Sequence, residues 1–525
     1  MDDFSTTKTL GEQSDHPILH NRSSRLLLCT VLLGVLANWF FFDQLPGISI
    51  PLFVFAFYSV FLWNTRSIVT VRRDFSGFLL IPISLLSLTY LIFSNMVFYA
   101  LNLMAIPILI VMQTTLAAGR SKSAWHSVKF IGDVFLGFFY RPFAFLFLPF
   151  RLIAKRLSKG LSMGKSSTLT RVLLGVLIAI PLVVIVVTLL ASADEVFSYF
   201  LGAIPELLEA INFDEFVPRF IFATVIALCS FSYIWSLITK RRPLTTFREP
   251  EDYVNLANSI DHVVAATILS IINAIYVFFT LIQFSYLFGG FSLDLPQQFT
   301  YAEYARRGFF ELILVTLINF SILLALIYWT KKVGKVMDRT IQVLESLLVG
   351  CTLIMLGSAF IRMYLYEQMY GFTYLRVLTH AFMILLFVLF IFTLCRIWNV
   401  RIELFKYYLL TAITAFVLVN YFNSDVLITK WNMARYEQTG KIDVGYLSSL
   451  SDGAIPQLTG LLQAEDEAVR AKTENYLFER KKELNDERSW QSFNLSRLHA
   501  KKVLANFELR HNKAYDYHTP DLPND

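Results

Sequence analysis

The sequence predicts an all-α fold, a polytopic bundle of about eleven transmembrane helices with a small helical C-terminal tail. Of the 525 residues, 55% are hydrophobic and only 16% are charged, whereas soluble domains carry about 25% charged residues. Many stretches stay apolar for the roughly 20 residues that a helix needs to cross a bilayer. Lipid offers the backbone no hydrogen-bond partners, so these stretches should be helices. Four cysteines cannot form a disulfide scaffold for a chain of this length.

The chain begins with a polar segment, residues 1–24, which predicts a cytoplasmic N-terminal tail. It lacks the features of a cleaved signal peptide, and no small-residue cleavage site follows the first apolar run, so that run should remain as an anchor. The predicted bundle covers residues 25–422. Its spans are 25–43, 48–64, 77–94, 96–117, 171–192, 218–239, 262–289, 309–330, 341–366, 375–396 and 402–422.

Lysine and arginine are distributed unequally between alternate loops, and this predicts the orientation. One set of loops and flanks holds 27 of these residues up to residue 422, and the opposite set holds five. Cytoplasmic loops carry the excess of positive charge, so the N-terminus should be cytoplasmic and the C-terminus extracytoplasmic. The net charge of +6 reflects this bias, and we expect no nucleic-acid partner.

Three segments are not simple spans. Residues 126–157 alternate aromatic and basic residues and contain Pro142 and Pro149, which predicts a broken helix in the inner headgroup layer, with a re-entrant hairpin as the alternative. Residues 193–216 are acidic with apolar residues at helical spacing, which predicts an amphipathic helix on the outer surface. Residues 423–525 have a soluble composition and predict an extracytoplasmic helical region, with short helices near Ile455, over 465–483 and over 490–509.

Polar residues at the outer ends of the spans form the candidate site. Arg362, Tyr366 and Tyr370 are four residues apart and should share one face of a helix, which Gly371 should end. The eight histidines and four cysteines show no ligand spacing, so we predict no metal site, no cofactor and no catalytic residue. The full candidate set is Asp194, Glu195, Arg306, Glu311, Arg362, Tyr366, Glu367, Tyr370 and Arg376.

These residues have two main interpretations. The arginines could neutralise the carboxylates and pin the helices together, since unpaired charges near hydrocarbon are costly. Alternatively, they could line an outward-facing pocket that binds an ion, an anionic headgroup or a small solute. Neighbouring carboxylates acting as general acid and base are a third possibility.

The same segments resemble a bacterial family of polytopic membrane proteins catalogued as domain of unknown function 4173. The resemblance covers about residues 192–458 and places this chain in a bacterial cytoplasmic membrane without implying an activity, cofactor or substrate. By the predicted orientation, all of its motifs lie at the outer face. They are Ser192–Phe197, Tyr304–Leu312, Arg362 to Arg376, Asn423-Ser424-Asp425 with Asn432 and Arg435, and Asp443 to Leu458.

Three functions are consistent with this sequence. The first is a protein that handles a solute, ion or lipid headgroup at the outward-facing polar site, with membrane lipids and a small solute as partners. The second is an envelope sensor or scaffold whose external C-terminal region binds another protein. The third is a membrane-embedded transferase acting on a lipid-linked substrate. We expect a non-enzymatic role over an enzymatic one.

Overall fold

The computed structural model describes residues 17–66, 68–69, 74–153, 213–239, 260–287, 309–331 and 334–511, with scattered positions between 175 and 194. Within this part of the chain every regular element is helical, apart from one isolated β-bridge between Ile260 and Thr330. The predicted all-α fold is confirmed.

Nine helices in the described residues are long and apolar enough to cross a membrane. The predicted span 48–64 corresponds to a shorter helix, α2, of 17 residues, and most of 171–192 lies outside the described residues, so eleven spans stay a prediction. The helices of the bundle are α1 (Pro17–Phe41), α2 (Ser49–Thr65), α3 (Phe75–Phe78), α4 (Leu80–Ile92), α5 (Met96–Ala117), α10 (Phe213–Ile238), α11 (His262–Leu287), α13 (Phe309–Trp329), α14 (Lys335–Tyr370), α15 (Tyr374–Trp398) and α16 (Leu404–Tyr421).

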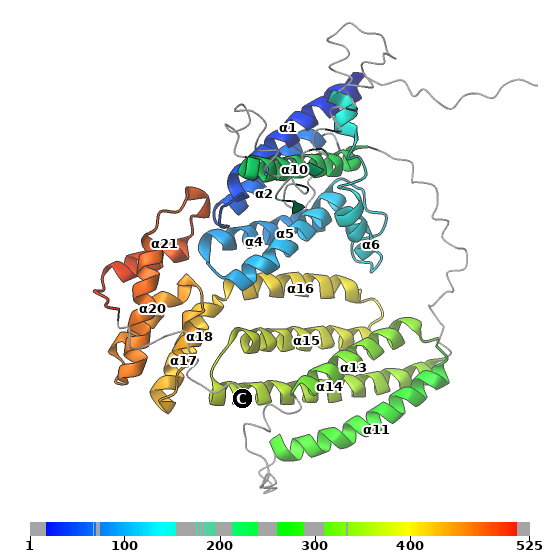
Figure 1. Cartoon of the computed structure of the whole chain (residues 1–525). Helices are drawn as coiled ribbons and strands as arrows, with labels where there is room; N and C mark the ends of the chain where they lie inside the picture. Colours follow the sequence, from blue (N-terminus) through cyan, green and yellow to red (C-terminus); the bar gives the residue numbers. More distant parts are fainter. Residues whose placement is uncertain are drawn as a thin grey trace, which may run out of the picture.

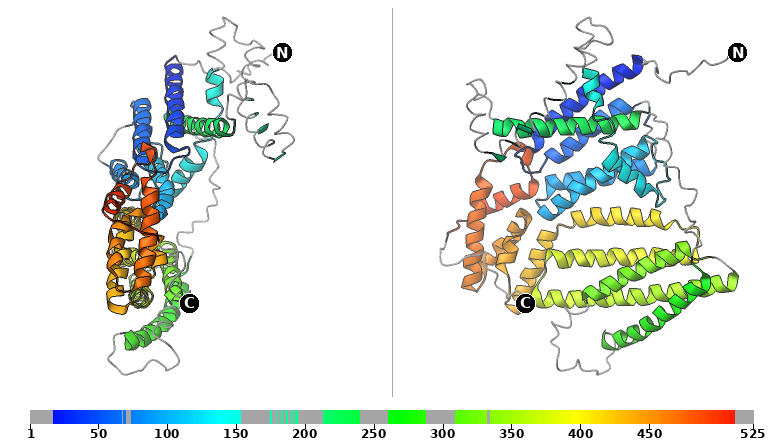
Figure 2. Two further views of the ribbon diagram at one scale, coloured as in Figure 1. Left: turned by 60° about the vertical axis from the view of Figure 1, so that its left-hand side comes forward. Right: turned by 45° about the vertical axis from the view of Figure 1, so that its right-hand side comes forward.

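The bundle is an extended row of helices rather than a closed ring. Helix α10 packs on α1, α1 on α2, and α2 on α4. The row continues from α4 to α16, then to α15 and α14. Helix α5 packs beside α4, and α11 and α13 pack on α14. Figure 2 (left) shows the row nearly edge-on as a narrow slab. One half of the row contains α1, α2, α4, α5 and α10, and the other contains α11, α13, α14, α15 and α16. The described contacts between them run mainly through α4 and α16. Each half also has an apolar core of its own.

The C-terminal helices form a separate unit across one end of this row, which we call the end cap (residues 424–505; Figure 1). It has a core of its own that includes Ile428, Leu447, Ile455 and Leu477. All three expected helices are present, with different bounds, and α17 and α18 were not predicted. The end cap comprises α17 (Ser424–Thr439), α18 (Val444–Ser448), α19 (Ile455–Leu458), α20 (Glu467–Asn485) and α21 (Leu495–Ala505).

The segment expected in the inner headgroup layer is a broken helix. Helix α6 (Phe130–Phe135) continues into a π-helical turn, η1 (Leu136–Tyr140). Turns around Pro142 interrupt the helix over 141–147, and it resumes at Leu148. Arg141 anchors the break, because its Nη1 donates to Thr115 Oγ1 at 3.2 Å and its Nη2 to the Arg120 carbonyl at 3.1 Å. The segment therefore packs on the C-terminal end of α5, while its depth in the membrane stays a prediction.

Candidate functional site

The corner between α14 and α15 carries most of the candidate residues that the structure describes. Gly371 ends α14 with φ +84°, as predicted from its position directly after Tyr370. The rings of Tyr366 and Tyr370 lie 4.8 Å apart, which confirms that they share one face of α14. Arg376 stacks its guanidinium over Tyr366 at 4.4 Å and donates to the Gly371 carbonyl. This arginine thus stabilises the corner through a ring and a carbonyl oxygen.

Helix α17 of the end cap clamps the same corner from outside the bundle. Arg435 is 5% exposed and donates through Nε to the Gln368 carbonyl at 2.8 Å, and through Nη2 to Met369 at 2.5 Å. Asn432 accepts from the Phe372 amide at 3.0 Å and donates to the Phe372 carbonyl at 2.8 Å. The last carbonyls of a helix lack partners within the helix, so Arg435 completes the end of α14.

Glu367 lies 2% exposed on α14 and pairs with a histidine rather than with one of the candidate arginines. Its Oε1 is 3.2 Å from His380 Nδ1, while His380 Nε2 is 3.3 Å from the carbonyl oxygen of Phe360. A carbonyl oxygen only accepts, so His380 Nε2 is the donor to Phe360, and Nδ1 faces the carboxyl group of Glu367. The histidine therefore gives the buried carboxyl group a polar partner, which reduces the cost of burying it.

A groove of about 960 Å³ runs from this pair along the membrane-spanning part of α15 and α16. Its wall on α15 extends from Val377 to Phe392, about 22 Å at 1.5 Å per residue. Hydrophobic side chains dominate the lining, and its only carboxyl and imidazole groups, Glu367 and His380, lie near the end cap. The groove therefore combines a long apolar channel with one polar end.

A second polar network joins the end cap to the other half of the bundle. Asp425, 2% exposed, accepts from Asn95 Nδ2 at 3.0 Å and from the hydroxyl of Ser451. Burial raises the pKa of Asp425, and the hydrogen bonds from Ser451 and Asn95 oppose that rise. Asn494 donates to the Tyr90 carbonyl at 2.9 Å, so α21 is tied to the end of α4.

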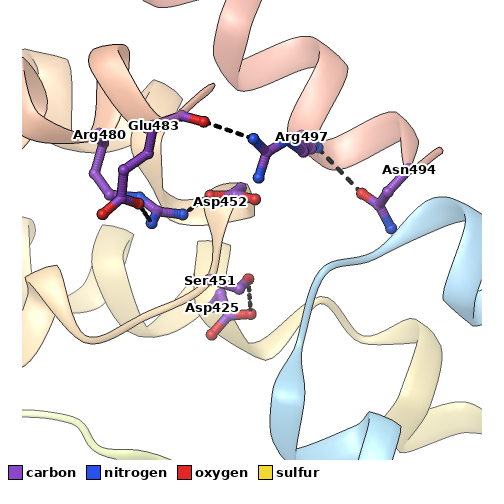
Figure 3. A network of polar contacts seen from close by, with 7 residues as sticks. All are labelled: Asp425, Ser451, Asp452, Arg480, Glu483, Asn494 and Arg497. Carbon is purple, nitrogen blue, oxygen red and sulfur yellow. Dashed lines mark hydrogen bonds and ion pairs between the residues drawn. The ribbon is translucent and has the colours of Figure 1, made fainter. Parts of the chain in front are cut away.

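Figure 3 shows how this network continues within the end cap. Arg480 lies between the carboxylates of Asp452 and Glu483 and pairs with both. Burial lowers the pKa of Arg480, but Asp452, Tyr476 and Glu483 together outweigh this effect and leave it raised. Arg497 donates to the Glu483 carbonyl at 2.8 Å. These contacts hold α20, α21 and the turn at Asp452 together, and we assign them a structural role.

The remaining candidates are not brought to the corner in the part of the chain that the structure describes. Asp194 is exposed, Glu311 is exposed in the first turn of α13, and Arg362 is half-buried on α14 one turn before Tyr366. Glu195 and Arg306 lie outside the described residues, as does most of the expected amphipathic helix 193–216. The α14–α15 corner therefore contains four of the nine candidates, Tyr366, Glu367, Tyr370 and Arg376.

Sequence reasoning did not identify His380 or Asn95 as site residues, since each acquires its role from a distant partner. A lone histidine near a helix end is usually a packing residue, and only the fold places His380 against Glu367. Asn432 and Arg435 were quoted for the resemblance, but no local pattern indicated what they bind. The sequence signal for such residues is a single polar side chain within an apolar run. Glu345 in α14 shows the same signal.

Comparison with known protein families gives one result for this arrangement of helices and end cap. A model described as "Domain of unknown function (DUF4153)" matches residues 80–461. The chain belongs to the DUF4153 family. The expectation of a family of unknown function is confirmed, while the specific resemblance to family 4173 has no support from this match. No curated protein and no solved structure matched the chain.

The DUF4153 match covers α4 through α19 and thus includes the α14–α15 corner, the groove and the clamp from α17. Helices α1, α2, α20 and α21 lie outside it. The connection between α20 and α21 contacts the end of α1 and the turn that follows it. Gln491 Nε2 donates to the Trp39 carbonyl at 3.2 Å, and Ser492 Oγ donates to the Leu45 carbonyl at 2.9 Å. This DUF4153 protein is an integral membrane protein of unknown molecular activity.

Proposed function

We propose that this protein handles phospholipid, holding an acyl chain in the groove along α15 and α16 with the headgroup at Glu367 and His380. The observation that carries the proposal is a groove of about 960 Å³ that is apolar along its length and polar at one end. A phospholipid has the same distribution of apolar and polar parts, and the apolar wall spans much of the ~30 Å hydrocarbon core.

The lining of the groove supports lateral entry from the bilayer. Ile384 and Leu418 line it and are 56% and 64% exposed, so the groove is open on the side that faces acyl chains. Gln368 and Ser424 add amide and hydroxyl groups near the Glu367–His380 pair. Glu367 and Gln368 offer carboxyl and amide oxygens that accept hydrogen bonds, so the polar end favours a zwitterionic headgroup with hydrogen-bond donors over an anionic one.

The proposal includes the orientation and the membrane. We place the protein in a bacterial cytoplasmic membrane with the N-terminus inside and the end cap outside. The excess of lysine and arginine in alternate loops supports this orientation, since Arg396 in the last turn of α15, and Lys331 and Arg401 just after helix ends, lie at the side opposite the end cap. The resemblance of the outer segments to family 4173, a family of bacterial membrane proteins, also supports this placement.

The groove is tested with vesicles of phosphatidylethanolamine and phosphatidylglycerol that contain a phosphatidylethanolamine with a photoreactive acyl chain. We expect cross-links on α15 and α16 at groove-lining residues, and at least a fivefold loss in Ala415→Trp, which fills the groove. Ala412→Trp is the matched control, because Ala412 is exposed on the same helix but does not line the groove. Equal labelling of both variants would contradict the proposal.

The polar end is tested with Glu367→Gln in the same vesicles. The substitution replaces one accepting carboxyl oxygen with an amide group that only donates, so we expect weaker retention of the ethanolamine lipid with the groove itself intact. Labelling from a photoreactive phosphatidylglycerol should be weaker than from phosphatidylethanolamine in the wild-type protein and less affected by the substitution. A stronger signal from phosphatidylglycerol in the wild-type protein would reverse the assignment of the headgroup.

A further inference from the structure

A second buried carboxyl group lies at the opposite end of α14. Glu345 is 5% exposed, and its carboxyl group forms no hydrogen bond or ion pair with another described residue. The hydroxyl of Thr330 is also buried without a hydrogen-bond partner there. Both residues line one small cavity of about 90 Å³. A polar cavity of this size is large enough to hold water.

The cavity lies at the membrane boundary opposite the end cap. Trp398 Nε1 donates to Ser346 Oγ at 3.0 Å, and the Arg339 guanidinium stacks over the Trp398 ring at 4.1 Å. Tryptophan and arginine are typical of the interface between hydrocarbon and headgroups. Glu345 precedes Ser346, so it lies at the same level of α14 as this boundary. Its side chain is buried in protein but lines the cavity, through which water can reach it.

The groups around Glu345 do not neutralise it by direct contact. Lys331, Asp338 and Arg396 line the cavity from the end of α13, from α14 and from α15, and none forms a described ion pair with Glu345. Helix α11, which also packs on α14, presents Asn273, whose Nδ2 donates to the Leu344 carbonyl at 2.9 Å. An ionised carboxylate without a partner costs several kcal/mol to bury, so the neutral acid is the stable form in this position.

We infer that Glu345 is a proton-binding site that exchanges with water through the cavity rimmed by Lys331, Asp338 and Arg396. The ligand is a proton, which the carboxylate takes from hydronium or water in the cavity and returns to it. The inference rests on Glu345 and Thr330, two buried polar side chains without a described hydrogen-bond partner that line one cavity able to hold water. It is independent of the lipid groove, which lies at the other end of α14.

Dicyclohexylcarbodiimide tests this site, because it enters apolar regions and reacts with protonated carboxyl groups. We expect mass spectrometry of the full-length protein in detergent to locate the adduct on Glu345, with a yield that falls at least tenfold as the pH is raised from 6 to 10. Glu437, which is exposed on α17, should remain unmodified and is the internal control. An unmodified Glu345, or a yield that does not change with pH, would overturn the inference.

Glu345→Gln provides a second measurement that does not depend on labelling. Ionisation of the wild-type group at high pH removes a stabilising neutral form, so wild-type thermal stability should fall with rising pH. The glutamine variant should lose this part of the pH dependence and unfold at a higher temperature than the wild type at pH 10. Identical pH profiles for the two proteins would also overturn the inference, and the labelling of the wild type remains decisive if the variant does not fold.

Discussion

At the scale of single residues, the buried polar groups of the end cap act through their contacts with helix ends. Arg435 is the clearest example, because its described partners are carbonyl oxygens of Gln368, Met369 and Lys441 rather than a carboxylate. Burial lowers the pKa of Arg435, and the nearby charge of Arg376 lowers it further. The negative end of the α14 dipole offsets this cost and fixes the guanidinium in place.

Asp425 gives a pH-dependent prediction. Because burial raises its pKa in the folded protein, the folded state binds this proton more tightly than the unfolded state. Its contribution to the free energy of unfolding is therefore greatest below the ordinary pKa of aspartate, about 3.9, and decreases as the pH rises through the folded-state value. Asp425→Asn keeps an oxygen that accepts from Asn95 and should show a smaller loss of stability over that range.

The measurement is the midpoint of thermal unfolding in detergent at a series of pH values from 4 to 8. Asp486→Asn is the control, since Asp486 is exposed at the end of α20 and should leave the slope unchanged. If Asp425→Asn and the wild type lose stability in parallel as the pH rises, Asp425 is not the group responsible.

At the scale of elements, the α14–α15 corner depends on a glycine that the end cap also uses. A Cβ on Gly371 would lie 2.6 Å from Asn432 Oδ1, and the backbone there is left-handed. Gly371→Ala should therefore lower the free energy of unfolding by about 1–3 kcal/mol, through backbone strain and displacement of Asn432. Gly350→Ala on the same helix meets no atom within 4 Å and should change stability by less than about 1 kcal/mol.

Chemical or thermal unfolding in detergent provides the comparison, with cysteine accessibility near Asn432 as a second measurement. The displaced clamp should raise the reactivity of Met433→Cys, which is half-buried against the end-cap core. Equal stability of the two alanine variants would show that α17 tolerates a side chain at the corner.

The sequence predicted what depends on local pattern. Apolar length located the spans, the four-residue spacing placed Tyr366 next to Tyr370, and Gly371 ended the helix as its conformational freedom suggested. Pairings across long sequence separations could not be predicted, because no periodicity connects His380 with Glu367 or Arg435 with Gln368. Helix α17 was missed for a related reason: it is a largely polar helix that the end-cap core stabilises, so apolar periodicity did not reveal it.

At the scale of the whole molecule, the end cap links the two halves of an open row of helices. It binds the α4–α5 connection through Asn494 and the α14–α15 corner through Arg435. The halves otherwise touch mainly through α4 and α16 in the described residues. The end cap is therefore an integral part of the bundle. Deleting residues 440–525 would remove the contact of Asn494 with the α4–α5 connection and that of the Tyr446 hydroxyl with the Tyr374 amide, rather than only an external binding module.

The described helix ends make the orientation testable with one pair of sites. Helices α1, α4, α14 and α16 end, and α2, α5 and α15 begin, at the end cap, whereas α15 ends at the opposite side next to Val400. Because Lys331, Arg396 and Arg401 lie at that opposite side, we expect the end cap to be extracytoplasmic. The four native cysteines would first be replaced by serine or alanine, since Cys395 is exposed.

In this background, an impermeant maleimide should label Glu437→Cys on α17 in intact spheroplasts and Val400→Cys only after lysis. Both positions are exposed in the folded protein, so a difference in labelling reports the side of the membrane rather than burial. The opposite result would place the groove's polar end and the Glu367–His380 pair at the cytoplasmic face. It would also place the cavity at Glu345 at the outer face, so the lipid and the proton would each be taken up from the other side.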